Sequence, residues 1–282
     1  MKVMTSPSEM RSAVKEHRAA GDSIGLVPTM GFFHAGHVSL IEAARHQNDV
    51  VVVSIFVNPT QFGPGEDFED YPRDLDRDLE MAERAGGDYV FHPGVADMYP
   101  QPYLTQIDVA DITEGLCGAR RPGHFQGVAT VVAKLFNVIP ADRAYFGMKD
   151  AQQVRVIDKM VEDLNFDIRI VARPTVREAD GLAMSSRNMY LSGEERAAAT
   201  ILYSSLRLAE EKISQGERDA SAVIAAMREL MQIEGLVEPE YVEVVDYRLL
   251  RPIKELRGQV LIALAARVGK ARLIDNLLVN LD

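Results

Sequence analysis

Apolar positions along the chain form short continuous runs that alternate with stretches of helical spacing. The first run covers residues 24–27, and the second, DVVVVSIFV at 49–57, is rich in β-branched residues. A continuous run of this kind is typical of a strand that is covered on both faces, as in a parallel sheet. Between the two runs, apolar residues recur at roughly helical spacing from Leu40 to Ala44. The order strand, helix, strand predicts a right-handed crossover and an α/β fold.

The remaining pattern supplies more elements in the same alternation. Helices are predicted over residues 8–20, 71–85, 125–138, 151–164 and 220–233, and strands over 88–92, 142–146 and 166–172. Alternating stretches at 241–247, 260–266 and 271–276 predict a small sheet near the end of the chain. Ser192, with Glu195 three residues on, has the pattern of a capping box and predicts the start of a long helix. Residues 93–103 are predicted to be irregular, and 105–117 are ambiguous, with a short strand and a turn as one interpretation.

The length of 282 residues is enough for one large domain with a smaller companion. We expect a Rossmann-like parallel sheet domain over residues 1–175 and a smaller α+β domain over 176–282, with Pro174 marking the change. The smaller domain is expected to act as a cap that excludes water from the ligand.

Composition narrows the class of function. The net charge is −11, and no long Lys/Arg cluster is present, so we expect no nucleic-acid partner. Cys117 is the single cysteine, which excludes an intramolecular disulfide and a four-cysteine zinc site, and we expect it to be a packing residue. The N-terminus is polar, and no stretch approaches 18 uninterrupted apolar residues, so we expect a cytoplasmic enzyme without a membrane anchor.

The stretch LVPTMGFFHAGHVSL at 26–40 is the leading candidate for chemistry. Pro28 is expected to stop the first strand, since proline cannot extend a central ladder. The helix that follows exposes backbone N–H groups and partial positive charge at its N-terminus, which suits an anion. His34 and His37 are three residues apart and can face one bound group. A phosphate site is therefore predicted, with surface histidines or a partial metal site as the alternatives.

Other candidates follow predicted strands or lie near predicted helix starts. Gln61 lies in a Pro- and Gly-rich loop at 58–71 that is expected to border the pocket, and Gln153 lies one turn into a helix. Glutamine amides fit a hydroxy acid with a carboxylate, although most glutamines are simply solvated. Lys149 is either a cation for phosphate or an exposed lysine. Ser185, Ser186 and Arg187 offer two hydroxyls and a guanidinium fork for phosphate oxygens, or merely begin a helix.

Several ordered motifs together resemble those of one family. They are PTMGxxHxGH, SIFVNPxQF, RPGHFxGVxT, GxKDxQQ, DGLAxSSRNxYL and RLIDN, the first five of which span Pro28 to Leu191. The chain thereby resembles the pantothenate synthetases, or pantoate–beta-alanine ligases, of the HxGH nucleotidyltransferase superfamily. The resemblance implies an ATP-dependent ligase that condenses (R)-pantoate with beta-alanine through a pantoyl adenylate, giving pantothenate, AMP and diphosphate for coenzyme A synthesis.

The resemblance also implies residue roles, carried over position by position. The catalytic residues would be His34, His37, Lys149 and Arg187. The ATP site would comprise these four together with Met30, Gly31, Gly147, Asp150, Val176, Met184, Ser185 and Ser186. Gln61 and Gln153 would bind pantoate, and Gln61 also beta-alanine. Mg²⁺ would bridge the phosphates, with no protein ligand assigned, and a homodimer is implied.

The chain departs from the family pattern at few positions. Met148 stands where glutamate is usual, and Phe32 and Phe33 stand where smaller or Leu-like residues are common. His124 and Arg121, in RPGHF, are candidates for substrate contact, and His124 has a hydrogen-bonded structural role as its alternative. Met30, Phe62 and Val132 are expected to be pocket wall.

Three rival functions remain open at this point. A pure adenylyltransferase would use the same phosphate grip without ligation. An aminoacyl-tRNA synthetase-like protein is disfavoured by the acidic charge balance. A nucleotide sensor without catalytic activity is disfavoured, because it would not need charged groups placed for a transition state. The chain has four candidates for such groups: His34, His37, Lys149 and Arg187.

Overall fold

The structure is a computed structural model that describes residues 1–281. These residues pack as two compact units, each assembled from separate stretches of chain. The first unit comprises residues 1–110, 121–148 and 156–174, and the second comprises 111–120, 149–155 and 175–281. Among the described residues, no helix is long and apolar enough to cross a membrane.

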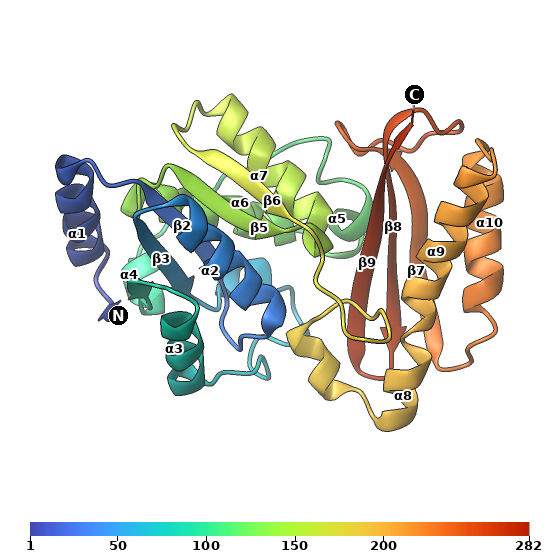
Figure 1. Cartoon of the computed structure of the whole chain (residues 1–282), viewed down its shortest axis with the longest axis horizontal. Helices are drawn as coiled ribbons and strands as arrows, with labels where there is room; N and C mark the ends of the chain where they lie inside the picture. Colours follow the sequence, from blue (N-terminus) through green and yellow to red (C-terminus); the bar gives the residue numbers. More distant parts are fainter. Residues whose placement is uncertain (282) are drawn as a thin grey trace. The chain divides into compact units, whose positions relative to one another are not determined.

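The first unit is built on a six-stranded sheet in which every pairing of the described strands is parallel. Its strand order is β1-β4-β3-β2-β5-β6. The strands are β1 (Lys2–Met4), β2 (Ile24–Thr29), β3 (Val50–Ile55), β4 (Tyr89–Phe91), β5 (Arg143–Gly147) and β6 (Arg169–Arg173). The helices between them are α1 (Pro7–Ala20), α2 (Ala35–Gln47), α3 (Leu75–Arg84), α4 (Val95–Met98), α6 (His124–Val138) and α7 (Ala151–Asp163), whose first residues belong to the second unit (Figure 1). The predicted Rossmann-like α/β class is confirmed.

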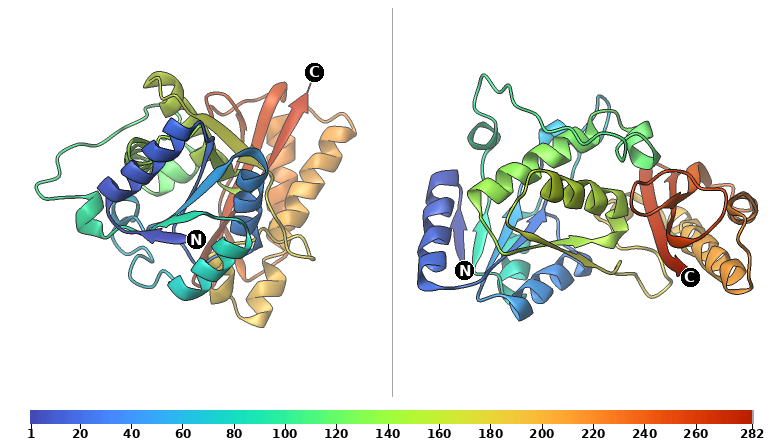
Figure 2. Two further views of the ribbon diagram at one scale, coloured as in Figure 1. Left: turned by 60° about the vertical axis from the view of Figure 1, so that its left-hand side comes forward. Right: turned by 90° about the horizontal axis from the view of Figure 1, so that it is seen from above.

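Helices cover both faces of this sheet, which is why its central strands are apolar without alternation. All of β3 is buried. Leu40, Ile41 and Ala44 of α2 pack with Ala82 of α3 against one face. Helix α6 lies on the other side of the strands, as the views in Figure 2 show, and contacts α1 there. Burial on both faces therefore explains the continuous β-branched run of the sequence.

The strand order places a topological switch point beside β2. The chain passes from β2 to β3 and β4 on one side, whereas β5 and β6 lie on the other. Ligands of open α/β sheets bind outside the carboxyl ends of strands at such a point. The segments after Thr29 and Gly147, at the ends of neighbouring strands, therefore border the expected ligand position of this unit.

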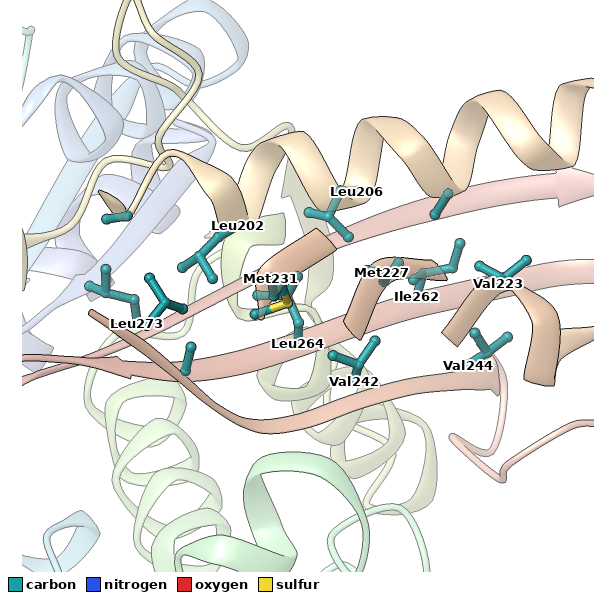
Figure 3. Packing of buried hydrophobic residues seen from close by; sticks show 14 of the residues in the cluster. Leu202, Leu206, Val223, Met227, Met231, Val242, Val244, Ile262, Leu264 and Leu273 are labelled. Atoms are coloured by element: carbon teal, nitrogen blue, oxygen red, sulfur yellow. The ribbon is translucent and has the colours of Figure 1, made fainter. Parts of the chain in front are cut away.

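The second unit contains a three-stranded antiparallel sheet in the order β7-β8-β9. Its main elements are β7 (Val237–Asp246), β8 (Gly258–Val268), β9 (Ala271–Leu281), α5 (Leu116–Arg120), α8 (Gly193–Ala198), α9 (Ile201–Ser214) and α10 (Ala220–Met231). Helices α9 and α10 pack on one face of this sheet, and the layer between them is apolar. Figure 3 shows side chains from both helices and from the strands meeting there, among them Leu202, Leu206, Met227, Met231, Val242, Ile262 and Leu264.

Some sequence expectations were wrong in detail. Pro28 lies inside β2, opposite Ser54 of β3, although it was expected to stop the strand. The pairing of β2 with β5 ends at Leu26, so the ladder on that side needs no N–H from Pro28. The expected long helix after Ser192 is divided into α8 and α9, although the capping box of Ser192 and Glu195 is present. Residues 93–103 include α4, and 105–117 form no named strand, ending instead in the first residues of α5.

The predicted assignment of residues 1–175 to ligand binding and of residues 176–282 to a cap remains a prediction. The chain passes from the first compact unit to the second after Pro174, and the second unit also contains residues 111–120 and 149–155. In particular, Lys149 belongs to the second unit, whereas Gly147 belongs to the first.

Candidate active site

In the first unit, the candidate phosphate turn connects β2 to α2. Gly31 and Phe32 both have a positive φ, 87° and 51°, so the backbone reverses sharply directly after the strand. The Thr29 hydroxyl donates to the carbonyl of Ser54 at 2.6 Å and accepts from the Gly31 N–H at 3.2 Å. Glycine adopts a positive φ without strain, whereas at phenylalanine the conformational strain must be offset by other contacts.

That compensation comes from Asp78, a residue that sequence reasoning missed. Its carboxylate accepts the N–H of Phe32 at 2.6 Å and of Phe33 at 2.7 Å, and the residue is only 1% exposed. Burial raises the pKa of Asp78, although these two N–H bonds act in the opposite direction. A signal was available, because Asp78 lies three residues after Leu75 and four before Ala82, on the apolar face of α3. A carboxylate on a buried helix face needs such donors.

The two histidines cap the N-terminus of α2 and lie against each other. The Nδ1 atom of His34 accepts the Gly36 N–H at 3.1 Å, and the Nδ1 atom of His37 accepts the His34 N–H at 3.3 Å. Their ring centroids are 4.1 Å apart. Because each Nδ1 accepts, a neutral ring carries its proton on Nε2, where it is a donor. The buried Phe33 ring packs beside His37, with the centroids 5.4 Å apart.

The Gln61 amide is oriented by its neighbours in the same unit. Its Oε1 accepts from Nδ2 of Asn58 at 3.1 Å, and its Nε2 points at Sδ of Met30, 3.1 Å away. The Tyr99 hydroxyl donates to Oδ1 of Asn58 at 2.7 Å. Burial raises the pKa of Tyr99 to about 12, so this donor keeps its proton at neutral pH. Gln61 therefore has a fixed amide with its NH₂ end turned toward the β2 turn.

The RPGHF segment supports the backbone of Gln61. Nδ1 of His124 donates to the Gln61 carbonyl at 2.8 Å, and its Nε2 accepts from Arg121 at 3.1 Å. Arg121 also forms a two-bond ion pair with Glu66, at 2.7 and 2.5 Å. Both ring nitrogens of His124 thus contact the protein, which favours the structural interpretation of this histidine.

In the second unit, Lys149 and Asp150 lie in a short 3₁₀ turn, η2 (Met148–Asp150), that leads into α7. Nζ of Lys149 is 3.2 Å from Oδ2 of Asp150. Gln152, which sequence reasoning did not single out, is buried and holds residues 112–117 by three hydrogen bonds of 3.0 Å. Gln153 beside it is half-buried. Of the two glutamines, Gln153 remains the candidate for a ligand contact.

The Ser185–Arg187 segment extends from a small hairpin in the second unit. Arg177 pairs with Ala183, and the Met184 N–H donates to the Val176 carbonyl at 3.0 Å. The Ser185 hydroxyl accepts the Arg187 N–H at 3.3 Å and caps the 3₁₀ turn η3 (Ser186–Tyr190). Val176, Met184, Ser185 and Arg187 thus belong to one local framework.

Within each unit, the structure brings predicted residues together. Met30, Gly31, His34, His37 and Gln61 lie around the β2 turn of the first unit, and Gly147 ends the neighbouring strand. Lys149, Asp150, Gln153, Val176 and Met184 to Arg187 belong to the second unit. That both sets act on one ligand stays a prediction. Among residues 1–281, no cluster of three or more His, Cys, Asp or Glu side chains could hold a metal ion.

A Rossmann-like sheet with a histidine-capped helix at its switch point defines a class, the α/β enzymes with an HxGH turn. Comparison with known proteins identifies the family within it. The sequence profile of the family described as pantoate-beta-alanine ligase matches residues 2–278. The chain belongs to this family, and its activity is the joining of pantoate to beta-alanine.

Individual relatives agree with this assignment over their whole length. The chain is 54% identical to a pantothenate synthetase of Fervidobacterium nodosum over 280 residues, which are 99% of this chain and 100% of the relative. It is also 54% identical to one of Moorella thermoacetica over 282 residues, covering 100% of both chains.

Solved structures with the same fold include two relatives with the same family name. The crystal structure of pantothenate synthetase from Thermus thermophilus superposes with a TM-score of 0.94 at 45% identity, covering 98% of this chain and 99% of that one. A pantoate-beta-alanine ligase from Francisella tularensis, complexed with beta-gamma ATP and beta-alanine, gives a TM-score of 0.81 at 34% identity, with coverages of 99% and 97%.

Proposed function

We propose that this enzyme condenses (R)-pantoate with beta-alanine through a pantoyl adenylate, giving pantothenate, AMP and diphosphate. In the first step, a carboxylate oxygen of pantoate forms a bond to the α-phosphorus of ATP, and the bond to diphosphate breaks. In the second, the amine of beta-alanine attacks the acyl carbon, the bond to AMP breaks, and the amine loses a proton. The observation that carries the proposal is the histidine-capped N-terminus of α2 at the switch point.

The first step gathers negative charge on the transferring phosphorus, so the protein must supply donors preset for it. The N–H groups of Gly36, His37 and Val38 already bond to His34, so the donors at this helix start are the Nε2–H groups of His34 and His37. Lys149, Arg187, Ser185 and Ser186 supply further charge and hydroxyls for the phosphates, and Asp150 accepts from the ribose. The beta-gamma ATP in the complex of the Francisella tularensis relative supports a nucleotide in this role.

The acid and the amine are assigned to the glutamines. Gln61 and Gln153 bind pantoate, and Gln61 also lies near beta-alanine. The fixed amide of Gln61, whose Oε1 is held by Asn58, supports the use of its NH₂ end as a donor to a carboxylate or hydroxyl. Residues 176–282 act as the cap of a ligand-binding part at 1–175, and exclude water from the labile adenylate.

Magnesium, when bound, would neutralise charge on the triphosphate. The described residues contain no cluster able to hold the ion by themselves, so they fit a metal that arrives on the phosphates and keeps water ligands. A homodimer, a cytoplasmic location and the absence of nucleic-acid or membrane partners complete the proposal.

The test is exchange of labelled diphosphate into ATP, measured with a panel of small acids. Exchange that requires pantoate supports the proposal. Exchange driven by phosphate esters would instead identify an adenylyltransferase, and exchange with amino acids would identify a synthetase-like activity. No exchange with any acid would overturn the adenylate.

A further inference from the structure

The motif RLIDN at 272–276 has no role in the site described so far. It lies on β9, where Asp275 and Asn276 are buried polar residues, 3% and 9% exposed. Successive residues of a strand point to opposite faces of the sheet. Asp275 lies opposite Leu264 of β8, on the face that α9 and α10 cover, and Asn276 therefore points to the other face.

On the helix-covered face, Asp275 anchors Arg177. The guanidinium forms two bonds to the carboxylate, of 2.6 and 2.9 Å, and lies over the ring of Tyr203, 4.1 Å from its centroid. Arg177 also donates to the carbonyl of Gly181 at 3.1 Å. A Cβ added at Gly181 would clash with the Tyr203 ring, so the hairpin packs closely against this ring.

This hairpin carries the Ser185–Arg187 segment. Arg177 pairs with Ala183 across it, and Nδ2 of Asn188 donates to the Ala183 carbonyl at 3.1 Å and to Glu178 at 2.8 Å. Anchoring Arg177 therefore fixes the base from which Ser185, Ser186 and Arg187 project.

On the opposite face, Asn276 holds the turn that carries Lys149. Its Nδ2 donates to the Lys149 carbonyl at 2.9 Å, and its own N–H donates to Oδ1 of Asp275 at 2.8 Å. One carboxylate thus contacts both the hairpin arginine and the residue that holds the lysine turn. All of these residues belong to the second unit.

We propose that Asp275 and Asn276 are a pair of positioning residues that set the spacing between the Lys149 turn and the Ser185–Arg187 segment for one nucleotide. This inference rests on the proposed function, because it assigns both segments to ATP. Neither residue is a catalytic residue, since each acts through another. Catalysis is sensitive to such spacing, and a misplacement of about 1 Å can cost on the order of a hundredfold in rate.

The experiment compares Asn276→Ala, alone and in a Lys149→Ala background, by pantoate-dependent exchange of diphosphate into ATP. Asn276→Ala is expected to lower kcat/KM for ATP on the order of tenfold to a hundredfold. In the Lys149→Ala background it should change the rate by less than about twofold, because its effect passes through Lys149. Asn280→Ala, the same change at an exposed position of β9, is the matched control and should stay within about twofold of wild type.

A second double-mutant cycle combines Asp275→Asn with Arg187→Ala. Asp275→Asn is likewise expected to lower kcat/KM for ATP in the wild-type background and to have little effect in the Arg187→Ala background. If Asn276→Ala does not fold, Asn276→Ser replaces it. Equal losses with and without Lys149, or a fall in melting temperature with kcat/KM for ATP unchanged per folded molecule, would make the pair merely structural and overturn the proposal. Absence of exchange in the wild-type enzyme would overturn the proposed function itself, which separates the two failures.

Discussion

The substitution Asp78→Asn tests how the phosphate turn is held. The carboxylate accepts two backbone N–H groups from a buried position, at 2.6 and 2.7 Å. An amide can accept only one of them, and its NH₂ group would face the other donor. A hydrogen bond to a charged group contributes about 1.5–3 kcal/mol, and a buried donor left unpaired costs about 1–3 kcal/mol. Because the variant also avoids burying a charge, we expect a net loss of about 2 kcal/mol.

The loss should appear both in stability and in nucleotide use. A decrease of this size lowers the melting temperature of a unit of this length by roughly 4–8 °C. The KM for ATP should rise as the turn before His34 relaxes, whereas the KM for beta-alanine changes less. Asp76→Asn, an exposed change on the same helix, is the control. An Asp78→Asn enzyme with wild-type stability and KM for ATP would refute the reasoning.

The pH dependence of the free energy of unfolding provides an independent test of Asp78. Burial raises the pKa of Asp78, so the folded chain binds its proton more tightly than the unfolded chain. The group therefore contributes a stability that falls as the pH rises from its usual pKa of 3.8 through the raised value. Asp78→Asn should remove this slope from the wild-type curve of stability against pH, measured by denaturant unfolding. A slope that persists in the variant would assign it to another group.

Three further predictions concern the surroundings of the site. Gly127→Ala should raise the KM for pantoate in steady-state assays, because the added Cβ would clash with the Thr60 carbonyl and displace Gln61. An unchanged KM would show that the loop adapts to the added Cβ without moving Gln61. Burial raises the pKa of Glu66, but the Arg121 ion pair outweighs it and holds that pKa below 4.5. The resulting stability is present above pH 4.5 and lost as the pH falls through the lowered pKa, so Glu66→Gln should flatten this acid-side loss in unfolding curves. Cys117 is buried and should react with a thiol reagent only after unfolding, whereas rapid labelling of the native enzyme would contradict its role in packing.

The sequence predicted best those elements whose pattern is long and local. The β-branched run of β3 and the helical spacing of α6 and α7 required no knowledge of distant contacts, and their residues form the expected elements. Pro28 was misjudged because its tolerance depends on where the pairing with β5 ends, which is a property of the sheet and not of the strand. No glycine or proline lies at the break between α8 and α9, so the sequence did not predict it.

The candidate site divides in the same way. The HxGH turn was visible as a motif, but the Asp78 carboxylate that supports it is 45 and 46 residues away in sequence from its partners. The assignment of residues 111–120 and 149–155 to the second unit likewise depends on packing with distant segments, such as Cys117 with Tyr241 and Lys149 with Asn276. Such supports are set by tertiary structure. Periodicity can place Asp78 on the apolar face of α3, but it does not show which donors the carboxylate meets.

The attack of the pantoate carboxylate on the α-phosphorus is best tested by isotope transfer. Pantoate labelled with heavy oxygen in its carboxylate is incubated with ATP, beta-alanine and the enzyme, and the products are analysed by mass spectrometry. The account predicts one labelled oxygen in AMP, the other in pantothenate, and none in diphosphate. Label in inorganic phosphate together with ADP, or unlabelled AMP, would contradict the adenylate.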